Sequence, residues 1–202
     1  MLKNSTSPTP TDHAGTSPTA VGQKFFWGAL PFVATPDPVV HRMLEVAHVG
    51  RSDTVMDLGC GDGRILLSAL KDFGAKMAIG YELREDLIDE SLKALRSMNL
   101  EGRAKIIKGD LIGADLSEAT VITIYLSGTG SQMLRSKFEG EVKKGTRIVS
   151  HGFAMEGWRS ARVDVCSGHK IFLYEAPRSF KAGGWAAVSQ SVRSFAHRLK
   201  LQ

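Results

Sequence analysis

Cysteine and long apolar runs are both scarce in this 202-residue sequence. It contains two cysteines, Cys60 and Cys166, and no run close to the roughly 20 apolar residues that a membrane-spanning helix requires. Two thiols exclude a disulfide framework and a structural zinc site built from four thiolates. The sequence also lacks the pattern of a secretory signal peptide. We therefore predict an intracellular, cytoplasmic protein with no membrane span and no metal.

Basic residues exceed acidic ones because of one part of the chain. Lys and Arg number 26 against 21 Asp and Glu, and residues 177–202 hold five of these bases and no acid. The rest of the chain is balanced in charge. We interpret 177–202 as a solvated basic C-terminal extension. Weak contact of this extension with nucleic acid or an acidic surface is the alternative interpretation.

Large apolar side chains are nearly absent from the first 20 residues, of which 11 are Ser, Thr or Pro. Such a segment cannot bury enough surface to offset the entropy lost on ordering. We therefore predict that residues 1–24 form a disordered tail. A single domain is expected over 25–176, beginning with the aromatic run at 25–27.

Short β-rich runs alternate with helical patterns through the middle of the chain. Strands are predicted at 54–58, 76–82, 104–108, 120–126 and 146–150, and helices at 65–73, at 84–98 and around Met133, Leu134 and Phe138. An earlier helix is predicted to begin at Pro36, with Thr35 as its N-cap.

The last two β-rich runs, 162–166 and 169–175, flank a Ser-Gly turn and predict a hairpin. Repeated βα units closed by an antiparallel pair predict an α/β fold. We expect a doubly wound, mostly parallel sheet of seven strands with an antiparallel last strand.

A glycine-rich turn, residues 57–64, follows the first predicted strand. Gly59, Gly61 and Gly63 allow the backbone to turn sharply and to approach a ligand closely. A dinucleotide fingerprint would need a small residue where Arg64 stands, and a Walker loop would need Gly-Lys-Ser or Gly-Lys-Thr. The turn therefore matches neither of these phosphate-binding motifs.

Acidic residues accompany this turn and the ends of the next two strands. Asp57 and Asp62 would repel a pyrophosphate, but they suit a ligand with a positive end, such as S-adenosylmethionine, which has an amino group, a sulfonium and no phosphate. Glu82 lies 23 residues after the first glycine and can accept hydrogen bonds from both ribose hydroxyls. Asp110 can accept one from the adenine amine, although taken alone it would be interpreted as a helix N-cap or loop carboxylate.

Together these residues resemble the class I, seven-strand methyltransferases that use S-adenosylmethionine. The loop at 57–63 resembles their first motif, Glu82 the acid that follows it, and Asp110 the acid of the third strand. The segments at 31–36 and 145–151 are similar to the archaeal broad-specificity protein lysine methyltransferases and to related mitochondrial enzymes.

This resemblance implies a Rossmann-like fold and methyl transfer from S-adenosylmethionine to the ε-amine of lysine in protein substrates with exposed lysines. S-adenosylhomocysteine is the implied product. Phe32 and Thr35 are expected to lie over the cofactor as a lid. The implied cofactor-binding residues are Phe32, Val33, Thr35, Asp57, Gly59, Cys60, Gly61, Asp62, Glu82, Leu83, Gly109, Asp110, Leu111 and Tyr125.

Three residues after the fourth and fifth predicted strands are candidates for the acceptor pocket and for catalysis, namely Tyr125, Ser127 and His151. Tyr125 could orient the amine or stabilise a cation with its ring, and His151 could accept a proton. Packing roles for both rings remain open. No strong base is required, because a dry pocket beside a sulfonium lowers the pKa of the lysine amine.

Two other functions remain open from the sequence. The glycine-rich segment at 125–130 and the basic extension leave a methyltransferase that acts on RNA or on a small molecule as the alternative. A non-enzymatic binder that has kept the fold is the third hypothesis, and the retained acids Asp57, Glu82 and Asp110 argue against it.

Overall fold

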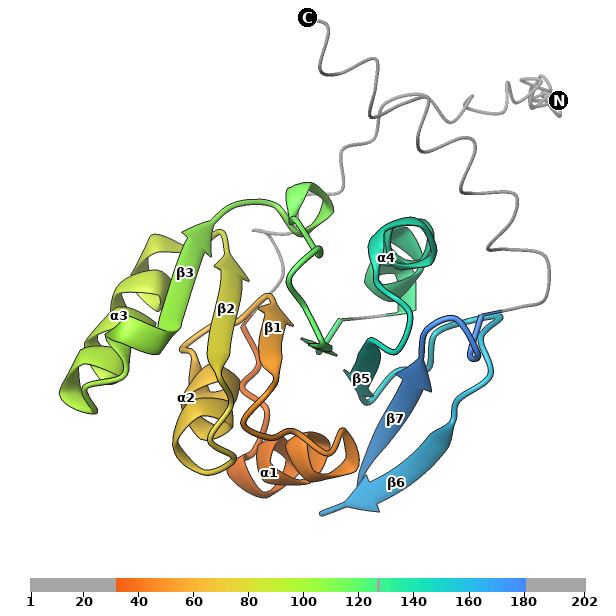
Figure 1. Ribbon diagram of the computed structural model, residues 1–202, viewed down its shortest axis with the longest axis horizontal. Coiled ribbons are helices and arrows are strands. Elements are labelled where there is room, and N and C mark those ends of the chain that lie inside the picture. Colours follow the sequence, from red (N-terminus) through yellow and green to blue (C-terminus); the bar gives the residue numbers. More distant parts are fainter. Residues whose placement is uncertain (1–31, 127, 181–202) are drawn as a thin grey trace, which may run out of the picture.

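The computed structural model describes residues 32–126 and 128–180 (Figure 1). The predicted tail 1–24, the aromatic run at 25–27, Ser127 and residues 181–202 of the basic extension lie outside the described residues.

In the described part, seven strands form one sheet in the order β3-β2-β1-β4-β5-β7-β6. The strands are β1 (Thr54–Leu58), β2 (Met77–Glu82), β3 (Ala104–Lys108), β4 (Val121–Ile124), β5 (Arg147–His151), β6 (Arg162–Cys166) and β7 (His169–Glu175). The first five are parallel, whereas β7 lies between β5 and β6 and is antiparallel to both. The predicted fold class is confirmed, including the reversed last strand.

Helices cover both faces of this sheet (Figure 1). They are α1 (Asp37–Val46), α2 (Arg64–Lys71), α3 (Glu85–Ser97) and α4 (Gly128–Glu141), with short 3-10 turns η2 (Glu101–Arg103) and η3 (Leu111–Gly113). One core cluster joins α1 and α2 to the sheet, and the other joins α4 and the loops on the opposite face. Every residue of β4 is buried, as expected for a central strand covered on both sides.

The start of α1 differs from the prediction that Thr35 caps the helix. Pro36 occupies the N-cap position, no side chain caps the helix, and the first helical residue is Asp37. The Thr35 hydroxyl instead lies 3.1 Å from Nδ1 of His151 on β5. A residue before proline favours extended backbone, which directs this side chain away from the helix and toward the sheet.

Two methionines of the predicted helices are exposed. Met98 follows the end of α3 and is 43% exposed, and Met133 is 37% exposed. Leu134 and Phe138, four residues apart and therefore on one face of α4, are fully buried. The buried face of α4 thus begins one position later than Met133.

No helix in the described ranges is both long enough and apolar enough to cross a membrane.

Candidate functional site

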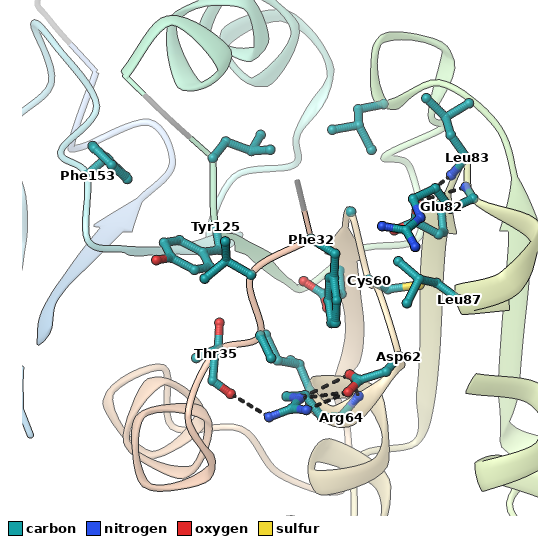
Figure 2. Close-up of a pocket in the computed structure, with 18 residues that line it drawn as sticks. Phe32, Thr35, Cys60, Asp62, Arg64, Glu82, Leu83, Leu87, Tyr125 and Phe153 are labelled. Atoms are coloured by element: carbon teal, nitrogen blue, oxygen red, sulfur yellow. Dashed lines mark hydrogen bonds and ion pairs between the residues drawn. The ribbon is translucent and has the colours of Figure 1, made fainter. Parts of the chain in front are cut away.

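A cavity of about 330 Å³ opens at the carboxyl ends of the central strands (Figure 2). This edge of an open α/β sheet is where ligands ordinarily bind. The cavity is lined by Phe32, Val33, Ala34, Thr35, Asp57, Gly59, Cys60, Asp62, Arg64, Ile65, Glu82, Leu83, Arg84, Leu87, Leu111, Tyr125, Leu126 and Phe153.

The glycine loop forms one wall because its backbone has conformations that other residues adopt rarely. Gly59, Gly61 and Gly63 have φ values of 86°, 54° and 80°. A Cβ atom on Gly61 would lie 2.3 Å from Cε2 of Phe32, so the ring of this lining residue packs directly on the loop. Gly61 itself is not among the lining residues and shapes the cavity through Phe32.

Glu82, at the end of β2, holds the glycine loop in place. Its Oε2 accepts a hydrogen bond from the backbone N–H of Gly61 at 3.0 Å. Its Oε1 accepts from the N–H groups of Leu83 at 2.8 Å and Arg84 at 3.0 Å. A carboxylate has about four acceptor sites, so Glu82 still has acceptor capacity for a ligand after binding these three donors.

Asp57, at the end of β1, is a buried carboxyl whose pKa is raised to about 7. Burial is the main cause, and the nearby carboxylates of Glu82 and Asp62 raise this pKa further. The Thr123 hydroxyl opposes the shift by donating a hydrogen bond of 2.7 Å to Asp57. Asp57 therefore changes charge near neutral pH.

Arg64, the first residue of α2, links the loop to the segment before α1. Its Nε donates to Asp62 at 3.0 Å, and its Nη1 donates to the carbonyl of Thr35 at 3.0 Å (Figure 2). In the sequence, Arg64 served only to exclude a dinucleotide motif, and it was not predicted as a site residue. Its position, one residue after the last glycine of the loop, was the feature of the sequence that could have indicated a site residue.

The opposite end of the cavity contains Tyr125, whose ring lies 3.9 Å from that of His151 between centroids. His151 is fully buried behind this ring and does not line the cavity. Burial, assisted by the neighbouring His169, lowers the pKa of His151 to about 4. Tyr125, His151 and Thr35 are thus brought together, whereas Ser127 lies outside the described residues.

The structure places the other predicted cofactor residues in two groups. Val33, Cys60, Leu83 and Leu111 line the cavity, and burial raises the pKa of the Cys60 thiol. Gly109 and Asp110 do not line it.

Asp110 caps η3 by accepting a hydrogen bond of 2.9 Å from the N–H of Ile112. This is the local role that Asp110 would have if interpreted alone.

Several lining residues were not found from the sequence, namely Ala34, Arg64, Ile65, Arg84, Leu87, Leu126 and Phe153. Arg84 and Leu87 lie two and five residues after the predicted strand that ends in Glu82, and this position was the signal for both. Phe153 is 43% exposed and is fixed by its carbonyl, which accepts a 2.5 Å hydrogen bond from the Ser150 hydroxyl. An aromatic residue three positions after the end of the predicted strand 146–150 was the only signal for Phe153.

The charged groups of the cavity favour a ligand that carries both signs of charge. Asp57, Asp62 and Glu82 contribute carboxyl groups, and Arg64 and Arg84 contribute guanidinium groups. The remaining walls are largely apolar, as in most small-molecule sites. Among the described residues, no cluster of three or more His, Cys, Asp or Glu side chains is arranged to hold a metal ion.

Comparisons with known proteins agree on one family. The model of the ANTKMT methyltransferase domain matches residues 57–162. A protein-lysine N-methyltransferase from Saccharolobus islandicus is 46% identical over 149 residues, which cover 72% of this chain and 92% of that protein. The adenine nucleotide translocase lysine N-methyltransferase of Mus musculus is 28% identical over 148 residues, covering 72% of this chain and 63% of that protein.

A solved structure is similar over the same part of the chain. The crystal structure of an RNA methyltransferase from Salinibacter ruber, in complex with S-adenosyl-L-homocysteine, has 39% sequence identity and a TM-score of 0.70. The similarity covers 72% of this chain and 94% of that chain.

Proposed function

Because the chain belongs to the family of ANTKMT methyltransferase domains, we propose that it methylates the ε-amine of lysine residues in protein substrates. The observation that carries this proposal is the 46% identity to a protein-lysine N-methyltransferase, which extends over 92% of that relative. The proposal includes protein substrates with exposed lysines. It also includes a cytoplasmic location, which the low cysteine content supports.

S-adenosylmethionine is the methyl donor of this family, and the cavity has the groups to bind it. When bound, it supplies a methyl group on a positively charged sulfur. We assign Glu82 to the ribose hydroxyls, Asp57 to the amino group and Arg64 to the carboxylate of this ligand. Their placement around one cavity supports the assignment.

The remaining walls are assigned by the same reasoning. Leu83 and Leu87 offer an apolar surface beside Glu82 for the adenine ring (Figure 2). Phe32 and Thr35 are assigned to the lid over the ligand. Asp110 stays a candidate for the adenine amine, although its carboxylate is already engaged with Ile112.

The acceptor lysine must lose a proton before it can form the new N–C bond. A free lysine has a pKa of about 10.4, so the neutral amine costs roughly 4–5 kcal/mol at pH 7. The rings of Phe32, Tyr125 and Phe153 line the cavity. Burial of the amine among these rings lowers its pKa, because desolvation disfavours the ammonium form.

Tritium from labelled S-adenosylmethionine will test this function. The purified protein is incubated with heat-unfolded bacterial lysate protein, and the products are hydrolysed to amino acids. We expect the label in methylated lysine, and protease treatment should release it from high-molecular-weight material. Label that survives protease and disappears with nuclease would contradict the proposal.

A methyltransferase that acts on RNA is the second candidate. The 39% identity to the RNA methyltransferase from Salinibacter ruber favours it, as does the basic extension at 177–202. The same experiment with total RNA separates the two functions, because only the second predicts label in isolated nucleosides.

A further inference from the structure

Thr35, His151 and His169 form a continuous chain of hydrogen bonds that leads away from the cavity. Oγ1 of Thr35 lies 3.1 Å from Nδ1 of His151. Nε2 of the same imidazole lies 2.9 Å from Nδ1 of His169, the first residue of β7. Thr35 lines the cavity, His151 is fully buried, and His169 is partly exposed to solvent. These hydrogen bonds thus connect the cavity wall to the protein surface.

The surroundings keep the central imidazole neutral. The ring of Tyr125 lies against the ring of His151. At Thr35, the cavity end of the hydrogen-bond chain, Arg64 donates to the backbone carbonyl. Within the described ranges, no carboxylate forms a hydrogen bond with either imidazole. A neutral imidazole has one donor and one acceptor nitrogen, so His151 can accept a proton on one side and release a proton on the other.

We propose that Thr35, His151 and His169 carry the proton of the acceptor lysine from the substrate-filled cavity to solvent. This inference rests on the proposed function, since lysine methylation must release one proton for each methyl group transferred. Thr35 is the member that meets the amine. His169 acts through His151 and is therefore a positioning residue.

The proton transfer balances at each atom. An N–H bond of the ammonium breaks as an O–H bond forms on Thr35, which passes its own proton to Nδ1 of His151. Nε2 of His151 passes a proton to Nδ1 of His169, and Nε2 of His169 releases a proton to water. The amine keeps its electron pair for the N–C bond, and the C–S pair returns to sulfur.

The reverse shift restores the starting tautomers. Once product has left, the cavity is open to water, which takes a proton from Thr35 while His169 regains one from solvent. The outward transfer is therefore needed only while the lysine fills the cavity.

The pH dependence of His169→Ala tests this inference at saturating cofactor and saturating heat-unfolded lysate protein. At pH 7 nearly all lysine arrives protonated, and we expect kcat to fall at least roughly tenfold. At pH 9.5 about a tenth of free lysine is already neutral, so the defect should shrink to about twofold. The affinity for S-adenosylmethionine, measured by calorimetry, should not change.

The matched control is Lys170→Ala, which removes an exposed cation from the next position of β7. Its side chain lies on the opposite face of the sheet from His169, and the variant should retain the wild-type pH profile. At the cavity end, Thr35→Val should show the same pH-dependent defect, and Thr35→Ser, which keeps the hydroxyl, should lose less.

Three results would overturn the inference. Wild-type kcat in His169→Ala at pH 7 would exclude an exit path through His169. An equal loss at pH 7 and pH 9.5 would indicate a structural role only, and His169→Asn repeats the comparison if the alanine variant unfolds. If the wild-type protein transferred the methyl label to RNA alone and none to lysine, both this inference and the proposed function would be overturned.

Discussion

The two ends of the cavity are held in place by different kinds of contact. At the glycine-loop end, the carboxylate of Glu82 binds three backbone N–H groups, two of them in adjacent residues. At the Tyr125 end, the walls depend on side chains that meet from distant parts of the chain, such as Thr35 and His151. The contacts of Glu82 therefore span at most 21 residues of the chain and two neighbouring strands, whereas the contact between Thr35 and His151 spans 116 residues.

The largest effect on ligand affinity is expected from a substitution in the glycine loop. Gly61→Val places a β-branched side chain at a positive φ and against the ring of Phe32. Strain and overpacking of this kind together amount to roughly 3 kcal/mol. We expect S-adenosylmethionine affinity to fall at least about a hundredfold in calorimetry.

The control for this variant is Gly102→Val, because nothing lies within 4 Å of a Cβ at Gly102 and its φ is not positive. Wild-type affinity in Gly61→Val would show that the loop does not shape the ligand site.

Glu82→Gln should have the second largest effect. The amide keeps the shape of the side chain but has one acceptor oxygen, so it cannot serve the loop and a ligand together. Loss of a hydrogen bond to a charged group corresponds to roughly 1.5–3 kcal/mol, or about tenfold to a hundredfold in affinity.

The melting temperature should also fall, because Gly61, Leu83 and Arg84 lose charged partners. Glu85→Gln, an exposed carboxylate outside the cavity, is the matched control. If Glu82→Gln lowered the melting temperature but did not change the affinity for S-adenosylmethionine, the role of Glu82 would be structural only.

The pH dependence of cofactor binding distinguishes the two ends further. The pKa of Asp57 is about 7 in the folded protein, so its carboxyl is neutral at pH 6 and mostly ionised at pH 7.5. The ionised form attracts a cationic ligand, and affinity should therefore rise roughly eightfold over this interval. Isothermal titration at both pH values measures the change.

Asp57→Asn should abolish this pH dependence. The raised pKa also affects folding, because Asp57 favours the folded state below its unfolded pKa near 3.8 and this contribution is lost as pH rises through 7. The asparagine variant should therefore melt at a higher temperature than the wild type at pH 8. A pH dependence that persists in the variant would point to another titrating group.

Phe153→Ala should have the smallest effect and should act at the Tyr125 end only. Phe153 lies on the far side of the cavity from Glu82 and Leu83 (Figure 2). Loss of its partly exposed ring should raise the KM for lysate protein by roughly threefold, on the order of 0.7 kcal/mol. The affinity for S-adenosylmethionine should stay within twofold of wild type, and a larger change would place Phe153 in the cofactor site.

The contrast between the two ends also explains what the sequence could predict. All seven strands, the reversed hairpin and the glycine loop follow from periodicity and glycine spacing, which are local. The capping role of Thr35 was predicted wrongly because its hydroxyl is held by His151, 116 residues away. His169 carried no local signal, since its role depends on the pairing of β5 with β7.

Asp110 illustrates the converse case. Its carboxylate binds the N–H two residues ahead, a contact that short-range rules describe well. Asp110 was predicted to bind a ligand only because it follows the end of a strand. Side chains that merely cap the next turn occupy such positions as well.

The reversal of β7 has a consequence for how this fold can vary. Because β7 runs against its neighbours, its first residues lie beside the last residues of β5. Ile171 pairs with His151, and the ring of His169 reaches that of His151 at the edge where β1 and β2 end. A parallel strand in that position would bring Glu175 there instead. The hairpin of β6 and β7 should therefore be exchangeable between relatives. Such an exchange would replace His169, the residue farthest from the cavity in the proposed proton path, and would leave the residues assigned to S-adenosylmethionine unchanged.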